Sequence, residues 1–546
     1  MSRSIKKICG FAILMSFLFH LLLPCAAVFA EEESVTILFT HDLHDHLLPY
    51  TVYKEGKIQT LGGFARLQSA IKAERERDPD LLLVDGGDFS MGTLFQTIFT
   101  SHAPQLRIMG HMGYDVTTFG NHEFDYRASG LAGSLRAALE SGDPLPQIVA
   151  SNLAFPSGKE SGLTPSLREL QEALSFYGVK EYLILERGNL KIGVFALMGK
   201  DAASNAPMAE VGFEDALESA SRLVEILKGE DVDLILSLSH SGTAGTSPKT
   251  EDEILAREVP GIDVIISGHS HTELKKPLII GTTIIGSCGQ YGQNLGILKI
   301  TRNTGEGWKL KDYRLKAIDE NVPADEKIDG LVDSFKDLVQ ENYLADFNLV
   351  FDQVLAYSPF NFTPPAQIGE EHREEPLANL IGDAYRYAVQ SAEGEDYEPI
   401  AAALVPSGTI RGSFLAGNLT TADVFIVSSL GIGRDGIPGY PLVSVYLTGR
   451  ELKTVCEVDA SVAPLMSAAQ LYLSGLSYSF NPNRLIFNKV MDVHLDHLDG
   501  SLEALDDNRL YRVVAGLYSG QMLPVVSAKS WGLLSVVPKD KEGVPI

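Results

Sequence analysis

Five short apolar runs of this chain each end just before residue types that bind metal ions. They are 35–40 before Asp42 and His44, 81–84 before Asp88, 116–119 before Asn121 and His122, 234–238 before His240, and 264–266 before His269 and His271. Such runs are typical of buried parallel strands, whose carboxyl ends meet along one rim of a sheet. One such side chain alone is often a cap or a turn residue. Together they predict a dinuclear metal site with hydrolytic chemistry.

The ligand types indicate two divalent ions. Asp42 and His44 are two residues apart and can reach one ion, and Asp88 follows two glycines that leave room for its carboxylate to bridge two ions. His269 and His271 are also two apart and in an extended loop point to opposite sides. Nitrogen and oxygen ligands without thiolates suit Zn²⁺, Mn²⁺, Co²⁺ or iron, and the sequence does not choose among them.

The segment 120–125, Gly-Asn-His-Glu-Phe-Asp, is the most informative stretch of the chain. Asn121 can offer its amide oxygen to a metal, which leaves His122 free to act as a charged donor or general acid. Asp125 lies three residues on and can orient the His122 imidazole and raise its pKa. The alternative is that Asn121 caps a helix and His122 lies on the surface.

Strand and helix signals alternate along the first half of the chain, and this alternation predicts an α/β fold. We expect a layered domain, a sheet sandwich flanked by helices, in which 62–66 opens a helix and 213–228 forms another. Residues 322–347 contain many acids and apolar residues at helical spacing, which predicts a connecting helix. A second α/β domain follows, with strand-like runs such as 401–405, 443–447 and 471–480.

Residues 1–30 have the pattern of a secretory signal peptide, with early basic residues, an apolar stretch and a small-residue end before Glu31. We therefore expect a secreted, periplasmic or cell-envelope protein. A retained anchor helix and lipid attachment at Cys25 are the alternatives. The predicted organisation is signal peptide 1–30, catalytic domain 31–321, linker helix 322–347 and substrate-binding domain 348–546.

The charge balance is strongly acidic, with 71 Asp and Glu against 45 Lys and Arg and a formal net charge of −26. Binding of nucleic acid needs clustered cations, so this partner class is excluded. An anionic substrate must be attracted by bound cations and not by the net field. Beyond the leader only Cys288 and Cys456 remain, and we expect buried free thiols there. No segment after the leader is apolar enough to predict a stable membrane span.

The ordered motifs Asp-x-His, Gly-Asp, Gly-Asn-His-Glu, a later single His and Gly-His-x-His resemble the calcineurin-like metallophosphoesterase superfamily. Within it, segments 40–44, 62–66, 87–93 and 151–152 and the two-domain length resemble the 5′-nucleotidase and UDP-sugar hydrolase family. The resemblance implies one ion held by Asp42, His44, Asp88 and His271, a second held by Asp88, Asn121, His240 and His269, and a catalytic dyad of His122 and Asp125. It also implies in-line attack of water on phosphorus.

In this family the second domain recognises the substrate. Segment 375–384, which contains Asn379, resembles the opening helix of that domain, and Arg373 lies close to the family's arginine-bearing stretch. Segment 406–411 resembles the family's Asn-Gly-Gly-Gly-Ile-Arg loop and keeps Arg411, but a proline replaces the leading asparagine. Arg411 is thus a predicted phosphate contact or an ordinary surface arginine.

Two aromatic rings enclose the nucleobase in this family. Tyr518 stands at the second ring position, whereas Leu430 occupies the first, where phenylalanine is usual. The expected Gly-Gly-Asp-Gly stretch is absent from 521–526, so the carboxylate that would accept hydrogen bonds from the ribose hydroxyl groups is missing. Tyr518 is therefore a base platform or a core residue, and the phosphoester chemistry is better supported than nucleoside specificity.

The expected activity is that of a 5′-nucleotidase, with two divalent ions as cofactors and a small phosphoester, a nucleotide, as partner. A 2′,3′-cyclic-nucleotide phosphodiesterase, a UDP-sugar hydrolase and a sulfur-ester hydrolase on the same scaffold are open alternatives. A surface binding protein that kept the fold and lost catalysis is an alternative of another class. The intact ligand series disfavours that last reading, because a degenerate enzyme would lose mutually repelling polar groups.

Overall fold

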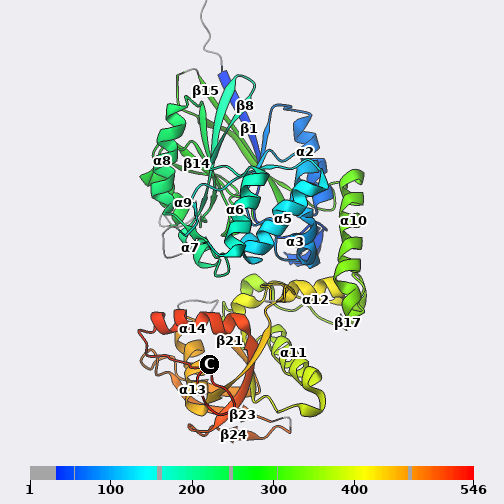
Figure 1. The fold of residues 1–546 in the computed structure, drawn as a ribbon, viewed down its shortest axis with the longest axis vertical. Helices are drawn as coiled ribbons and strands as arrows, with labels where there is room; N and C mark the ends of the chain where they lie inside the picture. The colour runs from blue at the N-terminus through cyan, green and yellow to red at the C-terminus, as the bar shows by residue number, and fades with distance from the viewer. Residues whose placement is uncertain are drawn as a thin grey trace, which may run out of the picture.

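A computed structural model describes residues 32–54, 56–156, 163–244, 250–303, 305–433, 435–464, 470–497 and 499–546. The chain forms two α/β parts, drawn one above the other in Figure 1, with helix α10 (Glu326–Asn342) along one side between them. The predicted signal peptide lies outside the described residues. Among the helices described, none combines the length and the hydropathy that crossing a bilayer requires.

Two six-stranded sheets stack face to face in the first part. One has the order β16-β15-β1-β4-β5-β6 and the other β13-β14-β12-β11-β9-β8. The bounds are β1 (Glu32–Thr40), β4 (Leu82–Asp85), β5 (Val116–Thr118), β6 (Gln147–Val149), β15 (Asn294–Asn303) and β16 (Lys309–Ala317), then β8 (Tyr182–Arg187), β9 (Leu190–Met198), β11 (Leu234–His240), β12 (Val264–Ser267), β13 (Leu278–Ile280) and β14 (Thr283–Gly286). Buried side chains of both sheets, such as Ile37, Val84 and Leu236, form one core between them.

Helices cover the outer faces of this sandwich. The first sheet is covered by α2 (Phe64–Arg75), α3 (Phe99–His102), α4 (Pro104–Met112), α5 (Arg127–Ser141) and α6 (Pro165–Tyr177), and the second by α8 (Ala216–Gly229) and α9 (Glu251–Glu258). Shorter elements are β2 (Tyr50–Lys54), β3 (Lys57–Leu61), η1 (Leu94–Ile98), η2 (His122–Phe124), β7 (Leu153–Ala154), α7 (Lys200–Ser204) and β10 (Gly212–Phe213). The helix predicted for 213–228 begins later, because the Asp215 carboxylate accepts the amides of Leu217 and Glu218 as its cap.

Helix α10 lies in the stretch predicted as a connecting helix. The Asp325 side chain accepts the Ile328 amide at its start, and Ile328, Val332, Phe335 and Val339 are buried on one face. Their spacing of three and four residues makes one apolar stripe, which packs into the core under the first sheet. The chain then passes through η3 (Leu344–Phe347) into the second part.

The second part is built on a four-stranded sheet of order β20-β25-β18-β21 and a three-stranded sheet of order β22-β23-β24. The strands are β17 (Val354–Ser358), β18 (Ala402–Pro406), β19 (Gly417–Thr420), β20 (Leu442–Thr448), β21 (Leu471–Ser474), β22 (Leu476–Phe480), β23 (Val490–Asp496), β24 (Leu502–Ala504) and β25 (Leu510–Gly516). The helices are η4 (Pro365–Gln367), α11 (Pro376–Glu393), η5 (Gly394–Asp396), η6 (Ser407–Thr409), α12 (Thr421–Val427), α13 (Gly449–Val462) and α14 (Leu517–Lys529). The single strand predicted for 471–480 is wrong, because Gly475 has φ 82° and sends its two halves into different sheets.

The two parts contact each other directly. Leu430 and Ile432 of the second part are buried in the apolar cluster under the first sheet. The Gln96 side-chain amide donates to the Ser429 carbonyl at 2.7 Å. Helix α14 faces the end of the first part that carries α7 (Figure 1). Residues 429–432, shortly before Tyr440, are thus fixed against the first part.

Candidate metal centre

The candidate ligands lie at the carboxyl ends of five strands. Asp42 and His44 follow β1, Asp88 follows β4, Asn121 follows β5, His240 ends β11, and His269 and His271 follow β12. The sequence predicted one rim, but these strands belong to both sheets of the sandwich. Stacking brings two rims together, so that ligands from each sheet meet in one cluster.

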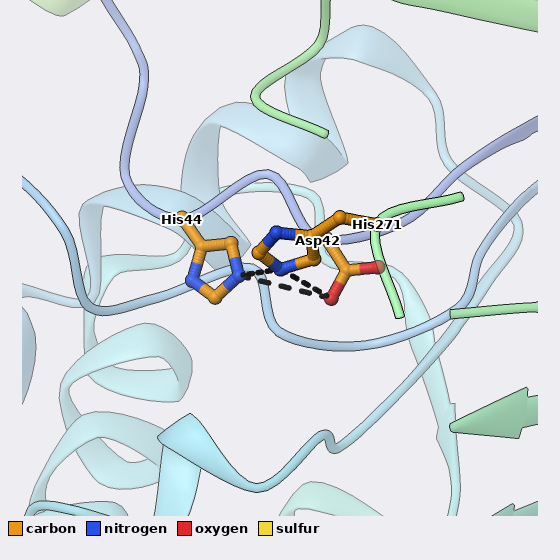
Figure 2. A group of neighbouring side chains, drawn as sticks. All are labelled: Asp42, His44 and His271. Carbon is orange, nitrogen blue, oxygen red and sulfur yellow. Dashed lines mark hydrogen bonds and ion pairs between the residues drawn. The ribbon is translucent and has the colours of Figure 1, made fainter. Parts of the chain in front are cut away.

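One ligand group consists of Asp42, His44 and His271, whose side chains point toward one another in Figure 2. His44 Nε2 lies 3.0 Å from His271 Nε2 and 3.7 Å from Asp42 Oδ1. His271 Nε2 lies 3.4 Å from the same Asp42 oxygen. Asp42 and His44 are buried, while His271 retains some exposure, so this group opens to solvent on one side only.

A second ligand group consists of Asp88, His240 and His269. His240 Nε2 lies 3.1 Å from Asp88 Oδ2, and Asn121 Oδ1 lies 3.0 Å from His269 Nδ1, which adds the amide to the group. Asp88 Oδ2 is also 3.8 Å from His44 Nε2 of the first group. The Asp88 carboxylate therefore stands between the two groups, where a bridging ligand would stand.

The hydrogen bonds of two imidazoles show why this donor set fits a cation. His44 Nδ1 faces the Met91 carbonyl at 3.0 Å and His240 Nδ1 faces the Gly86 carbonyl at 2.9 Å, so each Nδ1 carries the proton. Each Nε2 then presents a lone pair toward carboxylate oxygen, and the buried His240 Nε2 has no hydrogen-bond partner among the described residues. Facing lone pairs repel unless a cation lies among them. Mixed nitrogen and oxygen donors suit a divalent transition ion.

The titration behaviour of these imidazoles agrees with this geometry. Burial lowers the pKa of His44 to about 4, so its ring is a neutral ligand at physiological pH. Burial opposes protonation of His240 too, but the Asp88 carboxylate raises its pKa to about 10. In the absence of an ion, a proton is therefore held where the two acceptors face each other.

The backbone at the ligands is strained. Five of the seven candidate ligands have left-handed backbone angles: Asp42 (φ 52°), His44 (φ 48°), Asp88 (φ 53°), His269 (φ 74°) and His271 (φ 53°). Each such conformation costs roughly 1–3 kcal/mol and persists where the surroundings impose it, typically at functional sites. Gly120 is required for a related reason, because a Cβ there would lie 2.1 Å from Asp88 Oδ1.

His122 and Asp125 form a hydrogen-bonded pair beside the ligands. His122 Nδ1 lies 2.6 Å from Asp125 Oδ2, and the His122 backbone amide donates to Asp88 Oδ1 at 2.9 Å. Burial opposes protonation, but the Asp125 and Asp88 carboxylates raise the pKa of His122. His122 also forms a third group with His44 and Asp88, whose possible ligand atoms all lie within 4.8 Å of one another, and pairing of Nδ1 with Asp125 leaves Nε2 as its free ring nitrogen. A charged imidazole held in this way can donate a proton or stabilise an oxyanion.

Other residues support the cluster without having been singled out in the sequence. Glu123 is fully buried and accepts the backbone amides of Asp88, Ser90 and Gly120. Burial and the Asp88 charge raise its pKa to about 8. Its place in the Gly-Asn-His-Glu motif was the only sequence signal. It holds the loop that carries Asp88 to the loop that carries His122.

His41 contacts the candidate ligand Asp42. The Cys288 amide donates to His41 Nε2 at 2.7 Å, so the proton lies on Nδ1, which donates to Asp42 Oδ2 at 2.5 Å. His46 Nδ1 lies 2.8 Å from the His44 carbonyl, and its ring stacks on Tyr291 at 3.8 Å.

Cys288 is a free buried thiol, as is Cys456, which confirms the expectation for both cysteines.

The predicted substrate contacts of the second part lie in different surroundings. Burial, then His44, and then Arg411 lower the pKa of His46 to about 3, so the Arg411 guanidinium lies within electrostatic range of the cluster. Among the described residues Arg411 has no ion-pair partner. Arg373 instead pairs with Glu371 at 3.3 Å and Glu375 at 3.2 Å. The Asn379 amide oxygen is buried on α11 without a hydrogen-bond partner in the part of the chain that the structure describes.

Tyr518, on α14, packs against another aromatic ring, that of Tyr440, with centroids 5.5 Å apart. Burial, and then the charge of Asp125, raise the pKa of Tyr440, so this pair lies near the His122–Asp125 pair. Leu430, which the sequence placed at the first ring position, is instead buried against the first part. Tyr440 was missed because it follows a Gly- and Pro-rich stretch that gives no helical or strand pattern.

Family models and known proteins match both parts of the chain. The model for calcineurin-like phosphoesterases matches residues 35–273, and that for the 5′-nucleotidase C-terminal domain matches residues 358–522. The Bacillus subtilis trifunctional nucleotide phosphoesterase YfkN is 27% identical over 508 residues, covering 89% of this chain but only 32% of that relative. The Diplobatis ommata 5′-nucleotidase is 26% identical, covering 93% of this chain and 85% of that relative.

Solved structures agree with these matches. The crystal structure of the 5′-nucleotidase precursor from Thermus thermophilus superimposes with a TM-score of 0.70 at 25% identity, covering 94% of each chain. The predicted α/β class, with a metallophosphoesterase domain followed by a second α/β domain, is confirmed. The chain therefore belongs to the calcineurin-like metallophosphoesterase superfamily and, within it, to the 5′-nucleotidase family of phosphoric ester hydrolases.

Proposed function

We propose that this protein is an exported phosphohydrolase that releases phosphate from nucleotides and uses two divalent ions. The observation that carries the proposal is the convergence of facing acceptor groups on both sides of Asp88, next to the His122–Asp125 pair. One ion would be held by Asp42, His44, Asp88 and His271, and the other by Asp88, Asn121, His240 and His269. A surface binding protein would have no use for this concentration of strained, mutually repelling ligands.

Divalent ions bound here would polarise the phosphoryl group and activate water. The chain's own residues orient the reaction. The Asp125 carboxylate holds the His122 ring so that Nε2 faces the reacting oxygens, and the raised pKa keeps a proton on that ring for the developing negative charge or the leaving oxygen. Arg411 adds a guanidinium from the second domain to the phosphate. Each such stabiliser typically contributes ~3 kcal/mol to the transition state.

Nucleoside recognition is assigned to the Tyr440–Tyr518 pair. Stacking of a base on an aromatic ring contributes ~1–3 kcal/mol and tolerates different bases. The two rings touch each other at 5.5 Å, so a base enters by stacking on the outer face of one ring or by parting the pair. Arg373 and Asn379 stay predicted substrate contacts from the family resemblance, and Arg373 would first have to leave its two carboxylate partners.

A substrate panel tests the proposal. The purified protein is freed of metal, reconstituted with Mn²⁺, Zn²⁺ or Co²⁺, and assayed with AMP, 2′,3′-cyclic AMP, UDP-glucose and a thiosulfate ester. We expect metal-dependent phosphate release to be fastest from AMP. Faster turnover of one of the other esters would assign the protein to that substrate class. If none of the four substrates is hydrolysed in a metal-dependent way, the proposal that the protein is a phosphohydrolase is refuted. His122→Ala in parallel identifies contaminating phosphatase, which this substitution leaves unaffected.

Export is tested separately from catalysis. Amino-terminal sequencing of protein recovered outside the cytoplasm should begin at Glu31, because the predicted leader ends with small residues before that position. Full-length protein in the membrane fraction would show that the leader is not cleaved and is retained as an anchor. Release of the protein from the membrane only after its acyl chains are removed would show that it is attached by lipid.

A further inference from the structure

His269 differs from the other imidazoles of the candidate centre in the partner of its second ring nitrogen. His44 and His240 each use that nitrogen to face a backbone carbonyl, at 3.0 Å and 2.9 Å. His269 Nε2 instead lies 3.0 Å from the Asp201 carboxylate of α7. Of these three imidazoles, His269 alone therefore has a charged outer partner.

The Asp201 carboxylate is held in place although its side chain is 71% exposed. The Glu251 carboxylate accepts the amides of Lys200 and Asp201 at 2.7 and 2.9 Å and so fixes the first turn of α7. The Asn205 side-chain amide lies 3.5 Å from the same Asp201 oxygen that faces His269. An exposed ion pair is usually weak because ordering two free side chains offsets the attraction. Here Glu251 and Asn205 already hold Asp201 in place, so that only the His269 side chain remains to be ordered when the pair forms.

The contact also decides which His269 nitrogen is free to bind a metal. Because the carboxylate accepts the Nε2 proton, Nδ1 presents its lone pair toward Asn121 Oδ1, 3.0 Å away. Loss of the carboxylate would let the proton move to Nδ1 and block the ligand atom. A carboxylate partner also makes the imidazole a stronger donor.

We propose that Asp201 is a positioning residue that selectively tightens the ion held by Asp88, Asn121, His240 and His269. This inference rests on the proposed dinuclear function. It predicts that Asp201 affects the two ions unequally, because among the described residues no hydrogen bond or ion pair joins a side chain of α7 to Asp42, His44 or His271. Outer-shell partners of this kind typically change metal affinity 10–100-fold.

The test is calorimetric titration of Mn²⁺ into metal-free full-length protein, with Asp201→Ala and Asp201→Asn. We expect wild type to bind two ions, and Asp201→Ala to weaken one of them by about 10–100-fold with the other within threefold. Asp201→Asn should be intermediate, since its amide oxygen still accepts the Nε2 proton but carries no charge. Asp312→Ala, which removes a charge from an exposed aspartate of the same domain far from the ligands in sequence and topology, should change neither affinity.

A spectroscopic readout separates positioning from general damage. The visible spectrum of the Co²⁺-loaded protein should change at the second equivalent in Asp201→Ala, while the melting temperature of the metal-free protein stays that of wild type. Two ions bound by both Asp201 variants with wild-type affinities would overturn the proposal and leave the proposed function standing. Equal weakening of both ions would also overturn it. Fewer than two ions in wild type would refute the dinuclear function itself, and this inference with it.

Discussion

Substitution of Glu123 tests how the two ligand loops are held together. Its Oε2 accepts the amides of Asp88 at 3.1 Å and Gly120 at 2.7 Å, and its Oε1 accepts both the amide and the hydroxyl of Ser90 at 2.9 Å. The side chain is 0% exposed, so none of these donors can turn to water instead. A buried donor left without an acceptor costs ~1–3 kcal/mol.

The expected cost differs sharply between two variants. Glu123→Ala leaves the amides of Asp88, Ser90 and Gly120 without an acceptor, so we expect the free energy of unfolding to fall by roughly 3–9 kcal/mol. In Glu123→Gln the carboxamide oxygen still accepts the amides of Asp88 and Gly120, and its NH₂ group donates to the Ser90 hydroxyl. Only the Ser90 amide loses its acceptor, so we expect the free energy of unfolding to fall by ~1–3 kcal/mol.

Urea unfolding of the metal-free protein measures the difference. The chain has two tryptophans, Trp308 in the first domain, 6% exposed, and Trp531 in the second, 82% exposed. In a Trp531→Phe background, fluorescence therefore follows the first domain alone, which avoids averaging over two domains. Glu74→Gln is the matched control, because Glu74 binds only partly exposed arginines and should cost less than ~1 kcal/mol. Equal losses for the two Glu123 variants would refute the role assigned to the three amides.

Four further outcomes are expected. His122→Ala should keep both ions and lower turnover at least ~10²-fold, and near-normal turnover with measured metal content intact would remove it from the mechanism. Asp88→Ala should lower metal content by elemental analysis from two ions to at most one, since it removes the shared carboxylate; two retained ions would contradict bridging. Tyr518→Ala should weaken AMP binding by ~1–3 kcal/mol but leave KM for p-nitrophenyl phosphate unchanged, and parallel losses would make it a core residue. The hydrogen bond to Asp459 raises the pKa of His372. The stability that this pair adds to the folded protein is therefore complete below pH ~6.5, the pKa of an unfolded histidine, and is lost as the pH rises through the pKa of His372 in the folded protein. Asp459→Asn should therefore cost more stability at pH 5 than at pH 9, and equal urea midpoint shifts would refute the coupling.

The clustering of the candidate ligands was predictable because buried strands and metal-binding residue types both leave recognisable patterns in a sequence. The strand Leu82–Asp85 is fully buried and begins with three apolar residues, and a short apolar run of this kind stands out in the sequence because buried strands of a layered α/β domain are mostly apolar. The residues that follow such a strand lie at the carboxyl edge of its sheet, and this placement does not depend on contacts with distant parts of the chain. This is why Asp88 could be singled out with no knowledge of its neighbours, and why the fold class followed from the same runs.

The outer partners were not predictable, because they depend on placements that no local pattern encodes. Asp201 meets His269 across 68 residues, and Cys288 meets His41 across 247. Neither pair has a spacing rule. Asp201 and His269 meet because β9 and β12 lie on either side of β11 in one sheet, whereas Cys288 and His41 meet only when the two sheets are stacked. The left-handed backbone at Asp42 and His44 is likewise imposed by packing, because residues other than glycine rarely adopt it unaided.

Under the proposed function, the placement of Arg411 would explain how so acidic a protein receives an anionic substrate. The net charge of −26 repels a phosphate at long range, so attraction must arise locally. Under the proposed function, bound divalent ions would supply part of it from the first domain, and Arg411 would supply the rest from the second. Arg411 lies within electrostatic range of His46 and His122. Leu430 and Ile432, which follow it in the chain, are buried in the core of the first domain and anchor the second domain there. Under the proposed function, domain packing would therefore bring positive charge to the substrate. Substitutions of Leu430 or Ile432 that loosen this anchor should weaken phosphate binding although no candidate ligand is changed.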